Sequence, residues 1–328
     1  MKRFLTFEVA LLSLFVLSGC TPDSPTPSAP AKKQPAAAKK LVVGFSQIGA
    51  ESSWRTAETN SIRGEAEKRG VDLKFSDAQQ KQENQVKALN AFIAQGVDAI
   101  ILAPVVETGW ETVLTNAKEK KIPVILVDRG VKVSDDSLYT TLIASDFVAE
   151  GRMAAEWLAK KTDGKAKIVE LQGTPGAAPA IDRKKGFEQA LAKHPDMKII
   201  QSQTGEFSRA KGKEVMEAFL KSKGDEIQAV YAHNDDMALG AIQAIEEAGK
   251  KPGKDIIIVS IDGVKGAFEA MVEGKLNCTV ECNPLLGPAA FDAVQKAVAG
   301  ESLPKMTVVE DKVFDQSTAK DAIGDRKY

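Results

Sequence analysis

Polar and charged side chains follow several predicted strands of this 328-residue sequence, at the point where each strand ends. The carboxyl ends of parallel strands meet at one edge of a sheet, and open α/β sheets bind their ligands there. We therefore expect these side chains, with a few residues from nearby loops, to line one site. The candidates are Ser46, Trp54, Arg55, Asp128, Arg129, Arg183, Phe207, Asn234 and Asp262.

This set of side chains suits a neutral polyol such as a sugar. Each sugar hydroxyl is both a donor and an acceptor, and carboxylates and amides supply complementary partners. Guanidinium groups bridge neighbouring oxygens, while aromatic faces cover the C–H surface of the ring. Each candidate also has a plain alternative role as a turn residue or a helix cap. Their recurrence at strand ends favours binding.

Signatures of catalysis are largely absent. The sequence has no His-Glu-x-x-His, no P-loop and no dinucleotide-binding Gly-x-Gly-x-x-Gly. His194 precedes a proline in a predicted loop, and His233 ends a predicted strand. Asn234-Asp235-Asp236 is typical of a strand end followed by a helix N-cap rather than of a metal site. We expect no catalytic residue, no cofactor and no metal.

A secreted sugar-processing enzyme is the rival interpretation from another class. It requires a general acid and a general base that flank one glycosidic bond. Here the aspartates come with arginines, which favour the ionised carboxylate. Incubation with candidate sugars would separate binding from turnover.

The elements that position these residues alternate after Lys40 between β-branched runs and amphipathic stretches, which is typical of parallel sheets with crossover helices. The length and the repeated pattern predict two doubly wound, Rossmann-like lobes. With 44 basic and 45 acidic residues, no global charge favours nucleic acid as a partner. The predicted strands are Leu41 to Ser46, Val71 to Ser76, Ala99 to Ala103, Val124 to Asp128, Thr140 to Ala144, Lys167 to Leu171, Lys198 to Gln203, Ala229 to His233, Ile256 to Ile261, Cys278 to Cys282 and Met306 to Phe314.

The N-terminus resembles a bacterial lipoprotein signal. Lys2 and Arg3 precede a short apolar run, which ends in Leu17-Ser18-Gly19-Cys20. The resemblance implies a signal peptide over residues 1–20 and Cys20 as the lipidated residue that anchors the chain; a plain secretory signal is the alternative. The run is about half the ~20 residues that a membrane-spanning helix needs. Residues 21–40 are rich in proline, alanine and lysine, and they predict a disordered tether.

Cys278 and Cys282 are four residues apart in a predicted strand. This spacing places them roughly 13 Å apart at ~3.3 Å per residue, which is beyond disulfide reach. We expect two free, buried thiols.

From Leu41 to about Phe314 the sequence resembles the ribose and galactose type of periplasmic sugar-binding protein, and most closely its galactofuranose-binding members. The resemblance implies the type I fold, with a first lobe formed by residues 41–144 and 283–305 and a second by residues 145–282 and 306–328. A three-segment hinge near Ala144, Asn283 and Lys305 would join them. The stretches that carry the resemblance are Val43 to Gln47, Ser53 to Asn60, Gln79 to Gln85, Ala103 to Val106, Gly109-Trp110, Glu170 to Thr174, Ile181 to Phe187 and Tyr231 to Met237.

The resemblance also implies particular roles. Asp128 and Arg129 match a first-lobe pair that binds sugar hydroxyls, Arg183, Asn234 and Asp262 match second-lobe ligands, and Phe207 matches an aromatic residue that stacks on the ring. Trp54-Arg55 replaces two phenylalanines of the ribose binders. Ala103 and Cys282 replace an asparagine and a glutamine that contact ribose. These departures argue against ribose itself.

The implied function is the capture of a galactofuranose-like monosaccharide between the lobes and its delivery to the membrane subunits of an ABC importer. We expect an exported monomer that is lipid-anchored at the cell envelope. A sensor that presents the sugar to a chemoreceptor or kinase would use the same residues, so the sequence leaves that alternative open. Repressors that share this core carry a basic helix-turn-helix where this chain has a signal and a tether.

Overall fold

The computed structural model describes residues 40–328, which form one compact unit. The predicted signal peptide, Cys20 and nearly all of the predicted tether lie outside the described residues. Within the described part, no helix combines the length and the apolar character that crossing a membrane requires.

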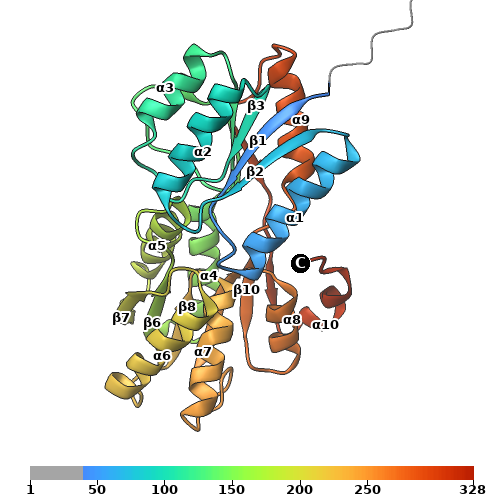
Figure 1. Ribbon diagram of the computed structural model, residues 1–328. Coiled ribbons are helices and arrows are strands. Elements are labelled where there is room, and N and C mark those ends of the chain that lie inside the picture. Colours follow the sequence, from blue (N-terminus) through green and yellow to red (C-terminus); the bar gives the residue numbers. More distant parts are fainter. Residues whose placement is uncertain (1–39) are drawn as a thin grey trace, which may run out of the picture. The chain divides into compact units, whose positions relative to one another are not determined.

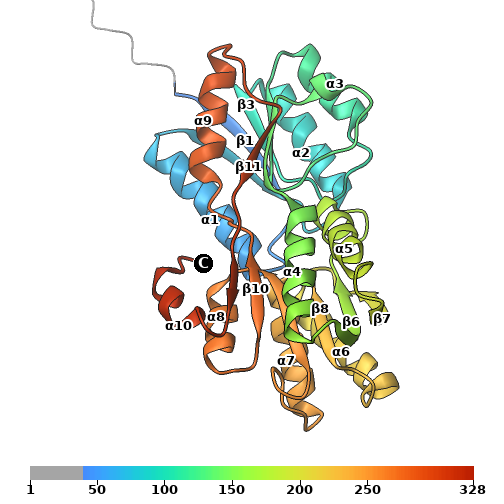
Figure 2. The ribbon, with the colours of Figure 1, turned by 180° about the vertical axis from the view of Figure 1, so that it is seen from behind.

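The described strands form two six-stranded sheets, one in each lobe (Figures 1 and 2). The first sheet has the spatial order β11 (Met306–Val309), β5 (Thr141–Ser145), β4 (Val124–Val127), β3 (Ala99–Leu102), β1 (Val42–Gln47) and β2 (Asp72–Asp77). The second has the order β12 (Val313–Asp315), β10 (Cys278–Glu281), β9 (Ile257–Asp262), β8 (Ala229–Ala232), β6 (Lys165–Gln172) and β7 (Asp196–Thr204). All neighbouring strands are parallel except β12, which runs antiparallel to β10. This arrangement confirms the predicted fold class.

Helices cover both faces of the first sheet, as the fully buried strands β3 and β4 require. Ile62 of one helix and Phe291 of another pack on one face with Phe45, whereas Leu89 and Leu114 pack on the other. The helices of this lobe are α1 (Ser53–Lys68) and α9 (Gly287–Val298) on the first face, with α2 (Gln82–Gln95) and α3 (Glu111–Glu119) on the second.

The second lobe has the same construction. Its helices are α4 (Phe147–Lys161), α5 (Ala178–Leu191), α6 (Arg209–Lys223), α7 (Asp235–Glu247), α8 (Lys265–Val272) and the short α10 (Ala319–Ala322). Helices α4 and α5 approach to backbone contact, because a Cβ atom on Gly151 would lie 2.0 Å from the carbonyl oxygen of Arg183. This close packing fixes the backbone from which the Arg183 side chain extends.

Three segments connect the lobes. The first crossover follows β5, the second follows β10, and the third joins β11 to β12. The sequence predicts one continuous strand from Met306 to Phe314 and a crossover before it, near Lys305. The structure shows two strands instead, so this prediction is wrong. β11 pairs with β5 in the first sheet, β12 pairs with β10 in the second, and the crossover is residues 310–312. The charged run Glu310-Asp311-Lys312 interrupts the apolar pattern, so each half extends a different sheet.

Candidate functional site

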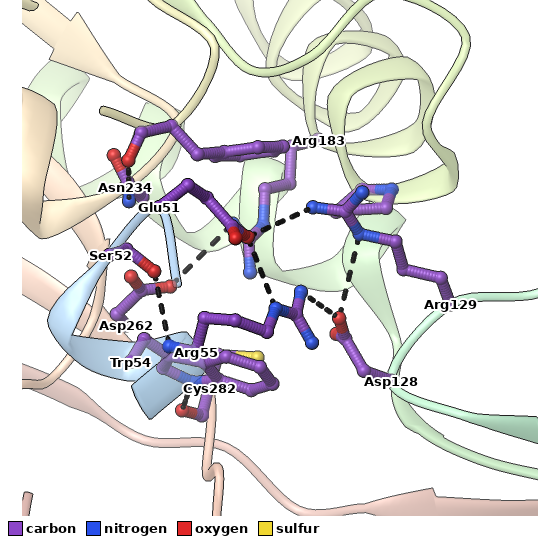
Figure 3. A pocket seen from close by; sticks show the side chains of 12 residues that line it. Glu51, Ser52, Trp54, Arg55, Asp128, Arg129, Arg183, Asn234, Asp262 and Cys282 are labelled. Atoms are coloured by element: carbon purple, nitrogen blue, oxygen red, sulfur yellow. Dashed lines mark hydrogen bonds and ion pairs between the residues drawn. The ribbon is translucent and has the colours of Figure 1, made fainter. Parts of the chain in front are cut away.

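A pocket lies at the carboxyl ends of the strands and is lined by residues of both lobes (Figure 3). About 280 Å³ of space free of protein atoms lies among its lining residues, part of it open to solvent. The lining contains every predicted binding residue except Ser46. Its members are Glu51, Ser52, Trp54, Arg55, Asp128, Arg129, Pro179, Arg183, Phe207, Asn234, Asp262 and Cys282.

Strand ends bring three of these residues together, with backbone angles that are uncommon outside glycine. Asp128 directly follows β4 with φ 61°, and Asp262 ends β9 with φ 132°. Phe207, in the loop between β7 and α6, has φ 60°. Non-glycine residues with positive φ are rare and cluster at functional sites, where the surrounding structure holds the strain.

Arg55 is the centre of a buried charge cluster in the first lobe. Its Nε lies 3.1 Å from Glu51 Oε1, its Nη2 lies 2.6 Å from Asp128 Oδ2, and its Nη1 pairs with Glu58. Burial alone would lower the pKa of Arg55, but the carboxylates of Asp128, Glu58 and Glu51 raise it well above its usual value. Burial raises the pKa of Glu58 to about 6. The guanidinium of Arg55 is therefore a fixed positive charge in the pocket wall.

Arg129 adds a second guanidinium to the same wall. Its Nη1 donates to the carbonyl oxygen of Val105 at 3.0 Å, and its Nε lies 3.5 Å from Asp128 Oδ2. Burial, followed by the positive charge of Arg55, lowers the pKa of Arg129 to about 10, so the group remains protonated at neutral pH. Arg129 Nε and Glu51 Oε2 are both buried without a hydrogen-bond partner in the protein. A ligand hydroxyl can satisfy such a donor and acceptor at once.

Arg183 has the corresponding place in the second lobe. Its Nε pairs with Glu150 Oε2 at 2.6 Å, its Nη1 donates to the carbonyl oxygen of His233 at 2.6 Å, and Asp262 Oδ1 lies 3.7 Å away. Burial alone would lower the pKa of Arg183, but Glu150 is the largest of the groups that raise it instead. Burial raises the pKa of Asp262 well above its usual range.

Asn234 is both a helix cap and a pocket residue, so both sequence interpretations of it hold. Its Oδ1 accepts from the backbone N–H of Met237 at 3.0 Å, which caps α7, and its Nδ2 donates to the carbonyl oxygen of Phe207 at 3.1 Å. A primary amide carries two N–H groups, so one donor remains for a ligand.

Two aromatic side chains supply apolar surface. Trp54 Nε1 donates to the carbonyl oxygen of Cys282 at 2.6 Å, which fixes the indole of this first-lobe residue against the second crossover. Phe207 packs against Gly173, where an added Cβ atom would lie only 1.9 Å from the Phe207 ring. Glycine at position 173 is therefore needed for the observed position of the ring.

Ser46 and His233 do not line the pocket. Ser46 is fully buried one residue before the end of β1, in register with Ser76 and Leu102 on the two neighbouring strands. His233 is fully buried, and its Nε2 lies 3.0 Å from Glu170 Oε1. The predicted free, buried thiols at Cys278 and Cys282 are confirmed.

Sequence reasoning missed Glu51, Ser52 and Pro179 as pocket residues, and it treated Cys282 only as a departure from the ribose pattern. Glu51 and Ser52 lie in the loop between β1 and α1, so the strand-end rule applied a few residues further along the chain would have found them. Burial raises the pKa of the Cys282 thiol, which stays neutral. Within residues 40–328, no cluster of three or more His, Cys, Asp or Glu side chains could hold a metal ion.

Two similar lobes around a buried polar pocket are the architecture of periplasmic binding proteins. Residues 43–302 match the family described as "Periplasmic binding protein domain". This chain belongs to that family.

Three relatives of this chain have names that specify a sugar. The chain is 54% identical over 296 residues to the galactofuranose-binding protein YtfQ of Escherichia coli (strain K12), covering 89% of this chain and 93% of that protein. It is 58% identical to the periplasmic binding protein component of the arabinose ABC transporter from Shewanella sp. ANA-3 bound to α- and β-L-arabinofuranose, with a TM-score of 0.86 and coverage of 88% and 96%. It is 52% identical to a protein from Mycobacterium smegmatis in complex with β-D-fucofuranose, with a TM-score of 0.86 and coverage of 88% and 95%.

Proposed function

We propose that this chain is the solute-binding protein of a sugar ABC importer and that it captures a furanose sugar, galactofuranose foremost, between its two lobes. The observation that carries the proposal is the pocket itself. It presents the buried guanidinium groups of Arg55, Arg129 and Arg183 beside the carboxyl groups of Asp128 and Asp262, within a small space.

The polarity of the pocket supports a neutral polyol rather than an ion. Positive and negative groups from both lobes are already paired with each other, as Arg55 is with Asp128, so a net charge on the ligand would find no excess of the opposite charge. Donors and acceptors that alternate at short spacing match the hydroxyl groups of a sugar.

The proposal that the sugar is a furanose depends on the named ligands of the relatives and on the residues at positions 55 and 282. The named ligands of the three relatives reported above are all furanoses. Arg55 offers several fixed donors where the ribose-binding pattern has an aromatic ring, and the thiol of Cys282 replaces an amide in the pocket wall. Ribose is therefore a poor match although it also forms a five-membered ring.

Closure follows from the division of the site between lobes. A ligand shifts a conformational equilibrium only by its differential contacts with the two states. Sugar held by Asp128 and Arg129 from one side and by Arg183 and Asp262 from the other contacts both lobes only when they are closed. The importer would recognise that closed form.

The proposal extends to the cellular setting. A signal peptide ending before Cys20, lipidation of that cysteine and a tether over residues 21–40 would hold a monomeric binding protein at the outer side of the cytoplasmic membrane or in the periplasm. Several acyl chains, at ~0.8 kcal/mol per buried methylene, make a stable anchor.

Small-angle scattering of the purified chain with and without sugar tests the proposal. We expect saturating galactofuranose to reduce the radius of gyration, whereas amino acids leave it unchanged. An unchanged radius at saturating sugar would contradict closure. A response to amino acids alone would contradict the sugar assignment.

A further inference from the structure

The N-terminus of α1, in the first lobe, reaches the second lobe (Figure 1), where hydrogen bonds hold it through residues that do not line the pocket. Ser53, the first residue of α1, donates from its backbone N–H to Asp236 Oδ2 at 2.8 Å and from its Oγ to the same atom at 2.6 Å. Asp236 belongs to the first turn of α7. Neither residue lines the pocket.

Asp236 is held ready for this contact by its own lobe. Its other oxygen, Oδ1, accepts from Arg209 Nε at 3.0 Å and from Arg209 Nη2 at 2.8 Å. Arg209 begins α6, so it stays with Asp236 when the lobes separate. Ser53 belongs to the first lobe, and its two hydrogen bonds to Asp236 break when the lobes open.

The two hydrogen bonds between Ser53 and Asp236 are strong ones. Asp236 is 4% exposed, and hydrogen bonds to an ionised acceptor are about twice as strong as those between neutral groups. The carboxylate also faces the N-terminus of α1, where free backbone N–H groups and the helix dipole favour negative charge. The pair therefore stabilises the closed arrangement without any contribution from the ligand.

We propose that Ser53 and Asp236 form a closure latch that sets how tightly this protein holds any accepted sugar but not which sugar it accepts. The inference rests on the proposed function. Apparent affinity scales with the population of the binding-competent state, so weakening the latch lowers it by one common factor for all ligands. Pocket residues instead act on each sugar differently.

Another contact between the lobes is formed by backbone atoms alone. The backbone N–H of Glu107, after β3, donates to the carbonyl oxygen of Gly176, in the loop before α5, at 3.0 Å. Side-chain substitution does not remove that bond. The Ser53 hydroxyl, by contrast, can be deleted cleanly.

Ser53→Ala is the first test, because it removes the Oγ donor and retains the backbone donor. We expect the Kd to rise about tenfold for both galactofuranose and arabinofuranose, the value for one hydrogen bond to a charged group. The ratio of the two Kd values should stay constant. Stopped-flow kinetics should show the loss in the dissociation rate, since an opened latch speeds release.

Ser134→Ala is a matched control. Ser134 also donates its backbone N–H and its Oγ to one carboxylate, that of Glu111, but both residues lie in the first lobe. This variant loses the same type of bond without affecting closure, so its sugar affinity should equal that of the wild type. A similar loss in both variants would overturn the latch.

Asp236→Asn provides a second variant. Combined with Ser53→Ala, it completes a double-mutant cycle. The latch predicts that Ser53→Ala costs less affinity when it is combined with Asp236→Asn than when it is made in the wild type. An unchanged Kd in Ser53→Ala, or a loss restricted to one sugar, would overturn the proposal. A wild-type protein that binds neither sugar would instead refute the proposed function.

Discussion

Arg55 Nη2 donates to Asp128 Oδ2 over 2.6 Å, and this bond joins the start of α1 to the end of β4 across the first-lobe wall of the pocket. Arg55 is the residue that most separates this sequence from the ribose-binding pattern. It is thus bonded directly to Asp128, a residue that is predicted to bind the sugar. Arg55 also pairs with Glu51 and Glu58. Specificity and the placement of the charges in this lobe therefore depend on the same guanidinium.

Asp262→Asn should weaken sugar binding and stabilise the protein without ligand. A carboxyl oxygen of Asp262 accepts a hydrogen bond from a sugar hydroxyl, and asparagine replaces one of the two oxygens with an NH2 group. The loss should cost about 0.5 to 1.5 kcal/mol, or roughly two- to tenfold in Kd. Burial raises the pKa of Asp262 well above the usual range, so the charged form is costly in the fold and asparagine removes that cost. Calorimetry and thermal unfolding check the two parts. Unchanged affinity would show that the pocket is wrongly assigned.

Gly173→Ala should lower sugar affinity by displacing the Phe207 ring. The new Cβ atom would lie 1.9 Å from the ring, so the ring must move away from the position at which it can stack on a sugar. The fold-change should be about ten or more, since an aromatic contact and its buried surface are lost together.

Gly64→Ala is the control for this substitution. Gly64 is an exposed residue of α1, and an added Cβ atom there has no neighbour within 4 Å. The control should keep full affinity and gain up to about 1 kcal/mol of stability from helix propensity. Wild-type affinity in Gly173→Ala would show that Phe207 does not contact the sugar.

The arrangement of Gly173 and Phe207 illustrates what the sequence could not predict. The strand-end rule singled out Asp128, Arg129, Asn234 and Asp262, and all four line one pocket, because a parallel sheet brings its carboxyl ends together whatever the packing. Their role as sugar ligands stays a prediction. The strand-end rule does not say which of several adjacent residues face the cleft. The rule therefore included Ser46, which does not line the pocket, and missed Glu51, which does.

The third crossover shows a second limit. The alternation of strands and helices predicted two doubly wound lobes, and the structure has them. A nine-residue run from Met306 to Phe314, however, has the same local pattern whether it extends one sheet or divides between two. Only long-range pairing with β5 and β10 decides this, and local periodicity carries no information about it.

Asp311→Asn should reduce the pH dependence of stability. Burial, and then the negative charge of Glu150, raise the pKa of this hinge carboxyl to about 8. The unfolded chain releases this proton near pH ~4. Between these values the folded state binds more protons, so the free energy of unfolding falls as the pH rises.

Because asparagine has no such proton, the decline from pH 5 to pH 8 should be shallower in the variant. The slope will not vanish, since burial also raises the pKa of Glu58 to about 6 and that of Asp235 to about 7. Denaturant unfolding across this range measures the slope. Asp225→Asn, at a fully exposed carboxylate, is the control. Equal slopes in the wild type and both variants would contradict the assignment.

Cys20→Ser should release the protein from membranes and leave sugar affinity unchanged. The thiol is the acylation site that the signal predicts, whereas the pocket belongs to a separate compact unit that begins at Lys40. Fractionation of cells that express each form, with calorimetry of the soluble protein, checks both statements. A variant that stays in the membrane fraction would argue against a lipid anchor at this cysteine.

Arg55→Phe requires a stability control before its affinity is interpreted. Removing the guanidinium leaves the buried carboxylates of Asp128, Glu51 and Glu58 without their main partner, and breaking a buried ion pair costs about 3 to 5 kcal/mol. We expect a lower Tm without ligand. Affinity should therefore be measured well below that temperature.

Isothermal titration calorimetry of the wild type and Arg55→Phe against galactofuranose, galactopyranose and ribose tests the central claim most directly. The wild type should bind galactofuranose in preference to the other two sugars. The variant should lose about 1.5 to 3 kcal/mol for galactofuranose, because its hydroxyl groups lose their charged donor. Ribose binding need not appear, since Ala103 and Cys282 still lack the ribose contacts. A variant with unaltered affinity and an unaltered order of preference would contradict the account, because Arg55 would then have no part in recognising the sugar.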